Sequence, residues 1–109
     1  MNFDPTDLAT KLLRHGADWA DKKAGADLLE ETKKTLLAEL TLRALVEAKS
    51  VNKAELVAEA SNEYREHIQL MIEARRKANR ARVQYDTDQA YVEMLRSLES
   101  TRRAELTMK

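Results

Sequence analysis

Apolar residues recur at a helical spacing through the second half of the chain. Two series three residues apart each repeat every seven residues: Val57, Tyr64, Met71, Ala78, Tyr85 and Val92, and Ala60, His67, Ala74, Ala81, Asp88 and Leu95. A repeat near 3.5 residues is typical of helices that wind around each other in a left-handed pair. The pattern therefore predicts a long helix over residues 53–107 that packs lengthwise against another helix.

Capping signals define the start of the chain and its turn. Asp4 is placed to cap a first helix, and Pro5 suits the first helical position. Asn52, with Glu55 three residues later, has the spacing of a capping box. We therefore expect a turn over residues 49–52.

These signals predict an all-α fold with one domain over residues 1–109. It is a long antiparallel helical hairpin of the coiled-coil type, with a first helix over residues 5–49 and a second over residues 53–107. Gly16 offers an alternative, because a break there would create a short N-terminal helix. We interpret Gly25, which lies between two alanines, as a residue tolerated for close packing.

Antiparallel pairing brings together positions whose numbers add to roughly 101. Small residues then face each other near the middle of the hairpin, where Ala74, Ala78 and Ala81 lie against the segment 17–27. We therefore expect a narrow contact there. His15 falls near Asp86 or Asp88, with which it can form an ion pair, while His67 falls opposite Lys34 and Trp19 opposite Arg82.

Leucines near the turn occupy two nearly opposite arcs of the first helix. One arc comprises Leu29, Leu36, Leu37 and Leu40, and the other comprises Leu28, Leu42, Leu45 and Val46. One partner helix covers only part of a helix surface, so the second arc requires another partner. We therefore expect this arc to be an oligomer interface, with a homodimer favoured and two hairpins pairing into a four-helix bundle.

Composition agrees with a helical protein and removes several classes of function. Alanine (16 residues) and leucine (15) dominate, whereas there are two glycines and one proline, too few for a sheet protein of 109 residues. There is no cysteine, and the net charge is zero. We expect a cytoplasmic protein without a secretory signal, a membrane span or an overall attraction to nucleic acid.

Five basic residues interrupt this even charge distribution within nine positions. They are Arg75, Arg76, Lys77, Arg80 and Arg82. They surround the helix as a collar, so salt bridges within the hairpin or between subunits are the favoured interpretation. The acidic residues of the first helix within reach are Asp18, Asp21, Asp27 and Glu30. The alternative is that this collar contacts nucleic-acid phosphates.

Candidate chemistry is otherwise sparse. The two histidines lie far apart and in no Glu-x-x-His pattern, and the two glycines cannot form a phosphate-binding loop. We therefore expect no catalytic residues, no bound cofactor and no metal site, and we expect a protein that is not an enzyme.

Several segments of the second half resemble uncharacterised small proteins of phages and prophages. They are Glu63-Tyr64-Arg65-Glu66-His67, the run from Glu73 to Ala81, Tyr85-Asp86 and Thr101-Arg102-Arg103-Ala104-Glu105. The resemblance implies an accessory role in phage recombination or DNA metabolism, in the host-cell cytoplasm, and supplies no catalytic residues. The residues themselves favour a self-associating protein–protein interaction module of unknown specific role.

Overall fold

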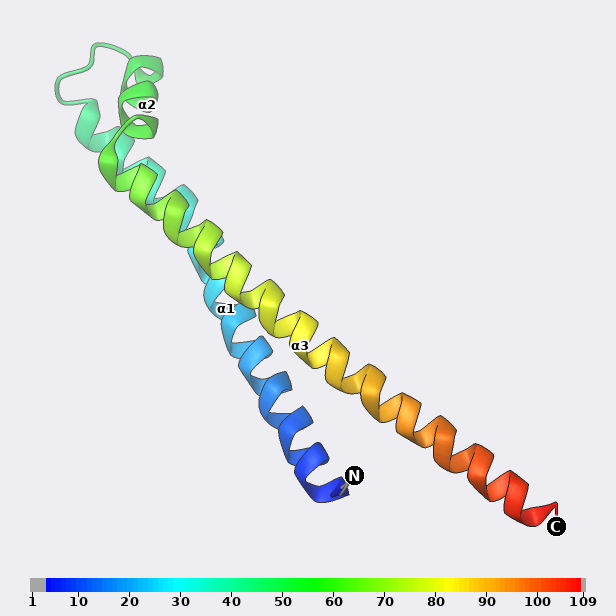
Figure 1. The fold of residues 1–109 in the computed structure, drawn as a ribbon. Helices are drawn as coiled ribbons and strands as arrows, with labels where there is room; N and C mark the ends of the chain where they lie inside the picture. The colour runs from blue at the N-terminus through cyan, green and yellow to red at the C-terminus, as the bar shows by residue number, and fades with distance from the viewer. Residues whose placement is uncertain (1–3, 109) are drawn as a thin grey trace.

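Three helices make up residues 4–108, the part of the chain that the structure, a computed structural model, describes. They are α1 (Pro5–Ala44), α2 (Val51–Glu59) and α3 (Asn62–Thr107). Helices α1 and α3 run antiparallel, so the molecule is a rod of 86 × 21 × 16 Å (Figure 1). The predicted all-α helical hairpin is confirmed.

Helix α1 begins where its capping residues predict. The Asp4 carboxylate accepts a hydrogen bond from the Thr6 backbone N–H at 2.9 Å, and Pro5 is the first helical residue. The helix continues through Gly16, so the alternative of a short N-terminal helix is wrong. It ends at Ala44 rather than near residue 49, because the backbone turns over the residues that follow.

The two glycines of α1 have different surroundings. A Cβ atom on Gly16 would lie 3.0 Å from Cε2 of Tyr85, so it is Gly16 that lets α3 approach closely. A Cβ atom on Gly25 would meet no atom within 4 Å. The interpretation of Gly25 as a close-packing residue is therefore wrong.

The second half of the chain is two helices, not the single helix predicted over residues 53–107. Ser50, and not Asn52, caps α2, since its hydroxyl accepts from the Lys53 N–H at 3.2 Å. Ser61 caps α3, because its hydroxyl accepts from the Tyr64 N–H at 3.2 Å and donates to the Ala58 carbonyl at 2.6 Å. A serine thus breaks the helix without glycine or proline.

Alanine dominates the buried core. The buried apolar residues are Ala26, Leu40, Ala54, Ala58, Ala78 and Ala81. Ala26, Ala78 and Ala81 lie in the middle part of the α1–α3 pair, which confirms that small residues pack this contact. Small side chains allow the helix axes to approach closely, but each of them buries little apolar area.

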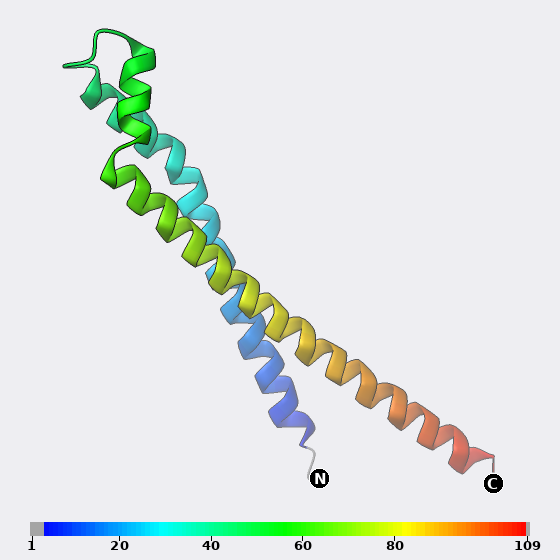
Figure 2. The ribbon, with the colours of Figure 1, turned by 45° about the horizontal axis from the view of Figure 1, so that its top comes forward.

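Helices α1 and α3 cross and then separate toward the two termini, as both views show (Figures 1 and 2). Helix α2 lies at the opposite end, beside the last turns of α1. The hairpin is therefore closed by three helices at its turn and forked at its termini.

Candidate interaction surfaces

Apolar side chains remain exposed on α1 and just beyond its C-terminal end. Leu28, Leu42 and Val46 form what we call the turn-end surface, and Leu42 and Val46 are 66 % and 86 % exposed. The other leucine arc faces inward, since Leu40 is buried and Leu36 is half-buried. The separation of the two arcs is as the sequence predicts, except at Leu45.

Helix α2 changes the composition of this end of the rod. It seats its buried Ala54 and Ala58 against the rest of the hairpin and leaves Val51, Leu56 and Val57 exposed. Leu45, expected on the same surface as Leu42, caps the C-terminus of α1 and is half-buried. The turn-end surface thus lacks Leu45, and α2 exposes further apolar side chains at the same end of the rod.

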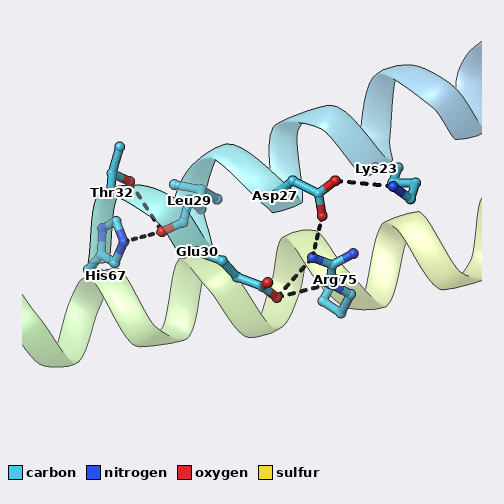
Figure 3. A network of polar contacts seen from close by, with 7 residues as sticks. All are labelled: Lys23, Asp27, Leu29, Glu30, Thr32, His67 and Arg75. Atoms are coloured by element: carbon cyan, nitrogen blue, oxygen red, sulfur yellow. Dashed lines mark hydrogen bonds and ion pairs between the residues drawn. The ribbon is translucent and has the colours of Figure 1, made fainter. Parts of the chain in front are cut away.

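Arg75 joins α3 to α1 through two carboxylates (Figure 3). Its Nη2 lies 2.8 Å from Oδ1 of Asp27 and 2.8 Å from Oε1 of Glu30, and Lys23 reaches the other oxygen of Asp27 at 3.2 Å. The hydrogen bond from Arg75, and next the one from Lys23, hold the pKa of Asp27 below its ordinary value. The salt-bridge interpretation of the collar is therefore correct for Arg75.

The other collar residues do not bridge the two helices. Arg76 lies 3.5 Å from Glu73, one turn back on α3. Lys77, Arg80 and Arg82 form no ion pair with any residue among positions 4–108, and all are exposed. Three of the five collar cations are thus available to an external anion, which keeps the nucleic-acid hypothesis open.

His67 has a structural place in the same region (Figure 3). Its Nε2–H donates to the backbone carbonyl of Leu29 at 2.8 Å, and the Thr32 hydroxyl donates to the same oxygen at 3.1 Å. A side chain of α3 therefore hydrogen-bonds to backbone already used within α1. This contact sets the register of the two helices near Arg75.

A second polar contact lies nearer the fork. His15 is hydrogen-bonded through Nδ1 to Asp88, which is only 8 % exposed and also accepts from Gln84 at 3.1 Å. Burial raises the pKa of Asp88, but the hydrogen bonds from His15 and Gln84 outweigh burial, so the pKa lies below its ordinary value. The predicted contact of His15 with Asp86 or Asp88 is confirmed, with Asp88 as the partner.

Aromatic rings pack beside this pair. Trp19 stacks on Tyr85 with ring centroids 5.6 Å apart and an angle of 31° between the planes. The pairing rule placed Trp19 opposite Arg82, whereas its aromatic neighbour is one helical turn further along α3. A stacked pair of this kind adds favourable contact energy beyond its buried area.

A groove lies between the diverging ends of α1 and α3. It has a volume of about 720 Å³, and its apolar lining includes Leu8, Leu12, Val92, Leu95 and Leu98. Arg96, Arg102 and Arg103 of α3 line it as well. The core periodicity includes Val92 and Leu95, but periodicity does not reveal that α1 has moved away from them.

Among residues 4–108, no cluster of His, Asp and Glu side chains has the grouping of a metal site. Within the same residues, no helix is long and apolar enough to span a bilayer. Comparison with family models, curated proteins and solved structures finds no match to the chain. The surfaces described above are therefore the basis for an argument about function.

Proposed function

We propose that this chain is a non-enzymatic interaction module that self-associates as a homodimer through the turn-end surface. Two hairpins joined there make a four-helix bundle, and the remaining helical faces contact a protein partner. The proposal includes a cytoplasmic location, which agrees with a chain that lacks cysteine.

One observation carries the proposal. Leu28, Leu42 and Val46 stay exposed although the hairpin has already formed and α2 has already packed against α1. Leu42 and Val46 lie only four residues apart, and an exposed apolar patch marks an interaction site. Leu28 lies about 21 Å further toward the start of α1. Because these three side chains are apolar, they favour an apolar surface as the partner, and a second copy of the chain supplies one.

Leu42→Glu is expected to shift the solution mass from dimer to monomer while circular dichroism still reports a largely helical chain. The glutamate places a charge where the two copies meet, and burying an unpaired charge is unfavourable. Light scattering coupled to size-exclusion chromatography measures the mass. Leu13→Glu is the matched control, because Leu13 is also exposed on α1 but lies toward the other end. Equal masses for wild type and Leu42→Glu contradict the proposal.

The second candidate is a nucleic-acid-binding accessory factor of phage recombination or DNA metabolism. The exposed and unpaired Lys77, Arg80 and Arg82 favour it, and Arg76 lies on the same helix. This candidate predicts oligonucleotide binding that weakens steeply with salt, because each phosphate contact releases counterions. Fluorescence anisotropy measures it with single- and double-stranded probes. Arg76→Glu with Arg80→Glu abolishes binding if the collar is the site, and no binding at low salt removes this candidate.

A further inference from the structure

We infer that Ser61 is a conformational hinge at which α2 and α3 convert into one continuous helix, so that α2 turns a different face toward α1. The structure holds what we call the bent form, in which α2 and α3 are separate helices that meet at an angle (Figures 1 and 2). We call the conformation with the continuous helix the straight form. The inference goes beyond the proposed self-association and does not depend on it.

One large change in a backbone torsion separates the two forms. Ala60, which follows α2, has φ −85° and ψ −5° and so needs only a small adjustment to become helical. Ser61 has φ −69°, a helical value, but ψ 151°, an extended one. Residues 51–107 include no glycine or proline. Rotation of ψ at Ser61 to about −42° therefore joins them into one helix.

The hydrogen bonds at the hinge are exchanged rather than lost in this conversion. In the bent form the Ser61 hydroxyl donates to the Ala58 carbonyl at 2.6 Å and accepts from the Tyr64 N–H at 3.2 Å. In a continuous helix each N–H bonds to the carbonyl four residues before it. The Ala58 carbonyl then accepts from the Asn62 N–H, and the Tyr64 N–H donates to the Ala60 carbonyl. Both forms thus satisfy the same backbone groups.

Helix α2 carries two faces suited to packing. In the bent form it buries Ala54 and Ala58, whereas Val57 is 56 % exposed and Ala60 is exposed as well. In the seven-residue repeat of the chain, Val57 and Ala60 instead continue the two series that α3 turns toward α1. The two faces lie about 100° apart around the helix. The repeat therefore fits α2 as the first turns of α3, with Ala54 and Ala58 turned away from α1.

The connection between α1 and α2 is long enough for the movement. The Arg43–Glu63 ion pair at 3.3 Å places the end of α1 beside the start of α3. In the straight form Val51 would lie about 16 Å further along the rod and about 10 Å to the side, or about 19 Å from Ala44. The chain from Ala44 to Val51 reaches about 23 Å when extended. Helix α2 can therefore align with α3 while α1 stays in place.

Two substitutions at the hinge move the equilibrium in opposite directions. Asn62→Pro favours the bent form, because Asn62 is the first residue of α3 and Ser61 already has the torsions of a residue before proline. In the continuous helix the same proline would lose a hydrogen bond and clash with the Ala58 carbonyl. Ser61→Ala favours the straight form, because alanine lacks the capping hydroxyl and is a good helix former.

Thiol labelling of an Ala58→Cys variant with a maleimide measures the conversion, because the chain has no cysteine of its own. Position 58 is buried in the bent form and exposed in the straight form. Adding Ser61→Ala is expected to raise the labelling rate about fivefold. Adding Asn62→Pro is expected to lower it by roughly tenfold or more. Ala54→Cys is a second reporter in case Ala58→Cys disturbs the packing of α2.

Ala78→Cys is the control, because position 78 is buried in the α1–α3 contact and neither hinge substitution should change its rate. A rate at position 58 that Asn62→Pro leaves unchanged overturns the inference, since α2 then leaves α1 without joining α3. Equal increases at positions 58 and 78 also overturn it, since the whole hairpin then opens. The same rate ratios are expected in a Leu42→Glu background, where the turn-end surface does not self-associate.

Discussion

Ala78→Leu is expected to lower the free energy of unfolding by about 2 kcal/mol, with a fall in Tm of roughly 8 °C. Ala78 is 2 % exposed in the α1–α3 contact, where Ala26 and Ala81 are also buried. A leucine has no room there, so α3 must move away from α1 or adopt a strained rotamer. Thermal unfolding followed by circular dichroism at fixed chain concentration measures the effect.

Ala24→Leu is the matched control for this substitution. Ala24 lies on α1 near the same level of the hairpin but is exposed. Its replacement adds the same atoms to solvent-facing helix, where substitutions usually change stability by less than about 0.5 kcal/mol. Equal Tm values for the two variants contradict the tight packing around Ala78.

Asp88→Asn is expected to destabilise the hairpin by about 1–2 kcal/mol at neutral pH. The carboxylate is nearly buried and accepts hydrogen bonds from His15 and Gln84. An amide at this position replaces one acceptor oxygen by a donor group, which leaves one of these contacts unmade. Urea unfolding gives the difference, and Asp21→Asn, at an exposed position of α1, is the control with no expected effect.

The same contact makes stability depend on acid pH. Because the pKa of Asp88 is lower in the folded chain than its ordinary value of 3.8, its stabilising contribution is present above pH 3.8. The contribution is lost as pH falls through the lower, folded-state pKa. The difference between wild type and Asp88→Asn should therefore shrink in unfolding experiments below about pH 4. A difference that stays constant to about pH 3 contradicts the role of the charged carboxylate.

The pairing of α1 with α3 follows from the sequence because, in an antiparallel helical pair, the position of the turn largely determines which residues face each other. Once a turn near residue 50 is chosen, numbering alone brings His15 near Asp86 or Asp88 and Arg75 near Asp27, and the structure has the contacts His15–Asp88 and Arg75–Asp27. Periodicity likewise separates the inward leucine arc from Leu42 and Val46. These features depend on spacing, which a single sequence displays.

The break between α2 and α3 could not be predicted in the same way. Glycine and proline break helices by known mechanisms, whereas Ser61 and Asn62 favour caps and turns more weakly and also occur inside helices. The break between α2 and α3 forms because the Ser61 hydroxyl donates to the Ala58 carbonyl and accepts from the Tyr64 N–H. In addition, α2 buries Ala54 and Ala58 against the rest of the hairpin. The fork was missed for a related reason: the apolar stripe continues through Val92 and Leu95, and helix divergence is a property of the whole pair.

The direction of the hairpin has a mechanical consequence. Both ends of the described chain emerge at the forked end, while the turn lies at the far end of a rod 86 Å long (Figure 1). Any molecule bound beside the turn is therefore held several nanometres from any domain or tag fused to either terminus. A pair of fluorophores, one at the turn and one at a terminus, would report a single long separation, and the protein would act as a molecular spacer.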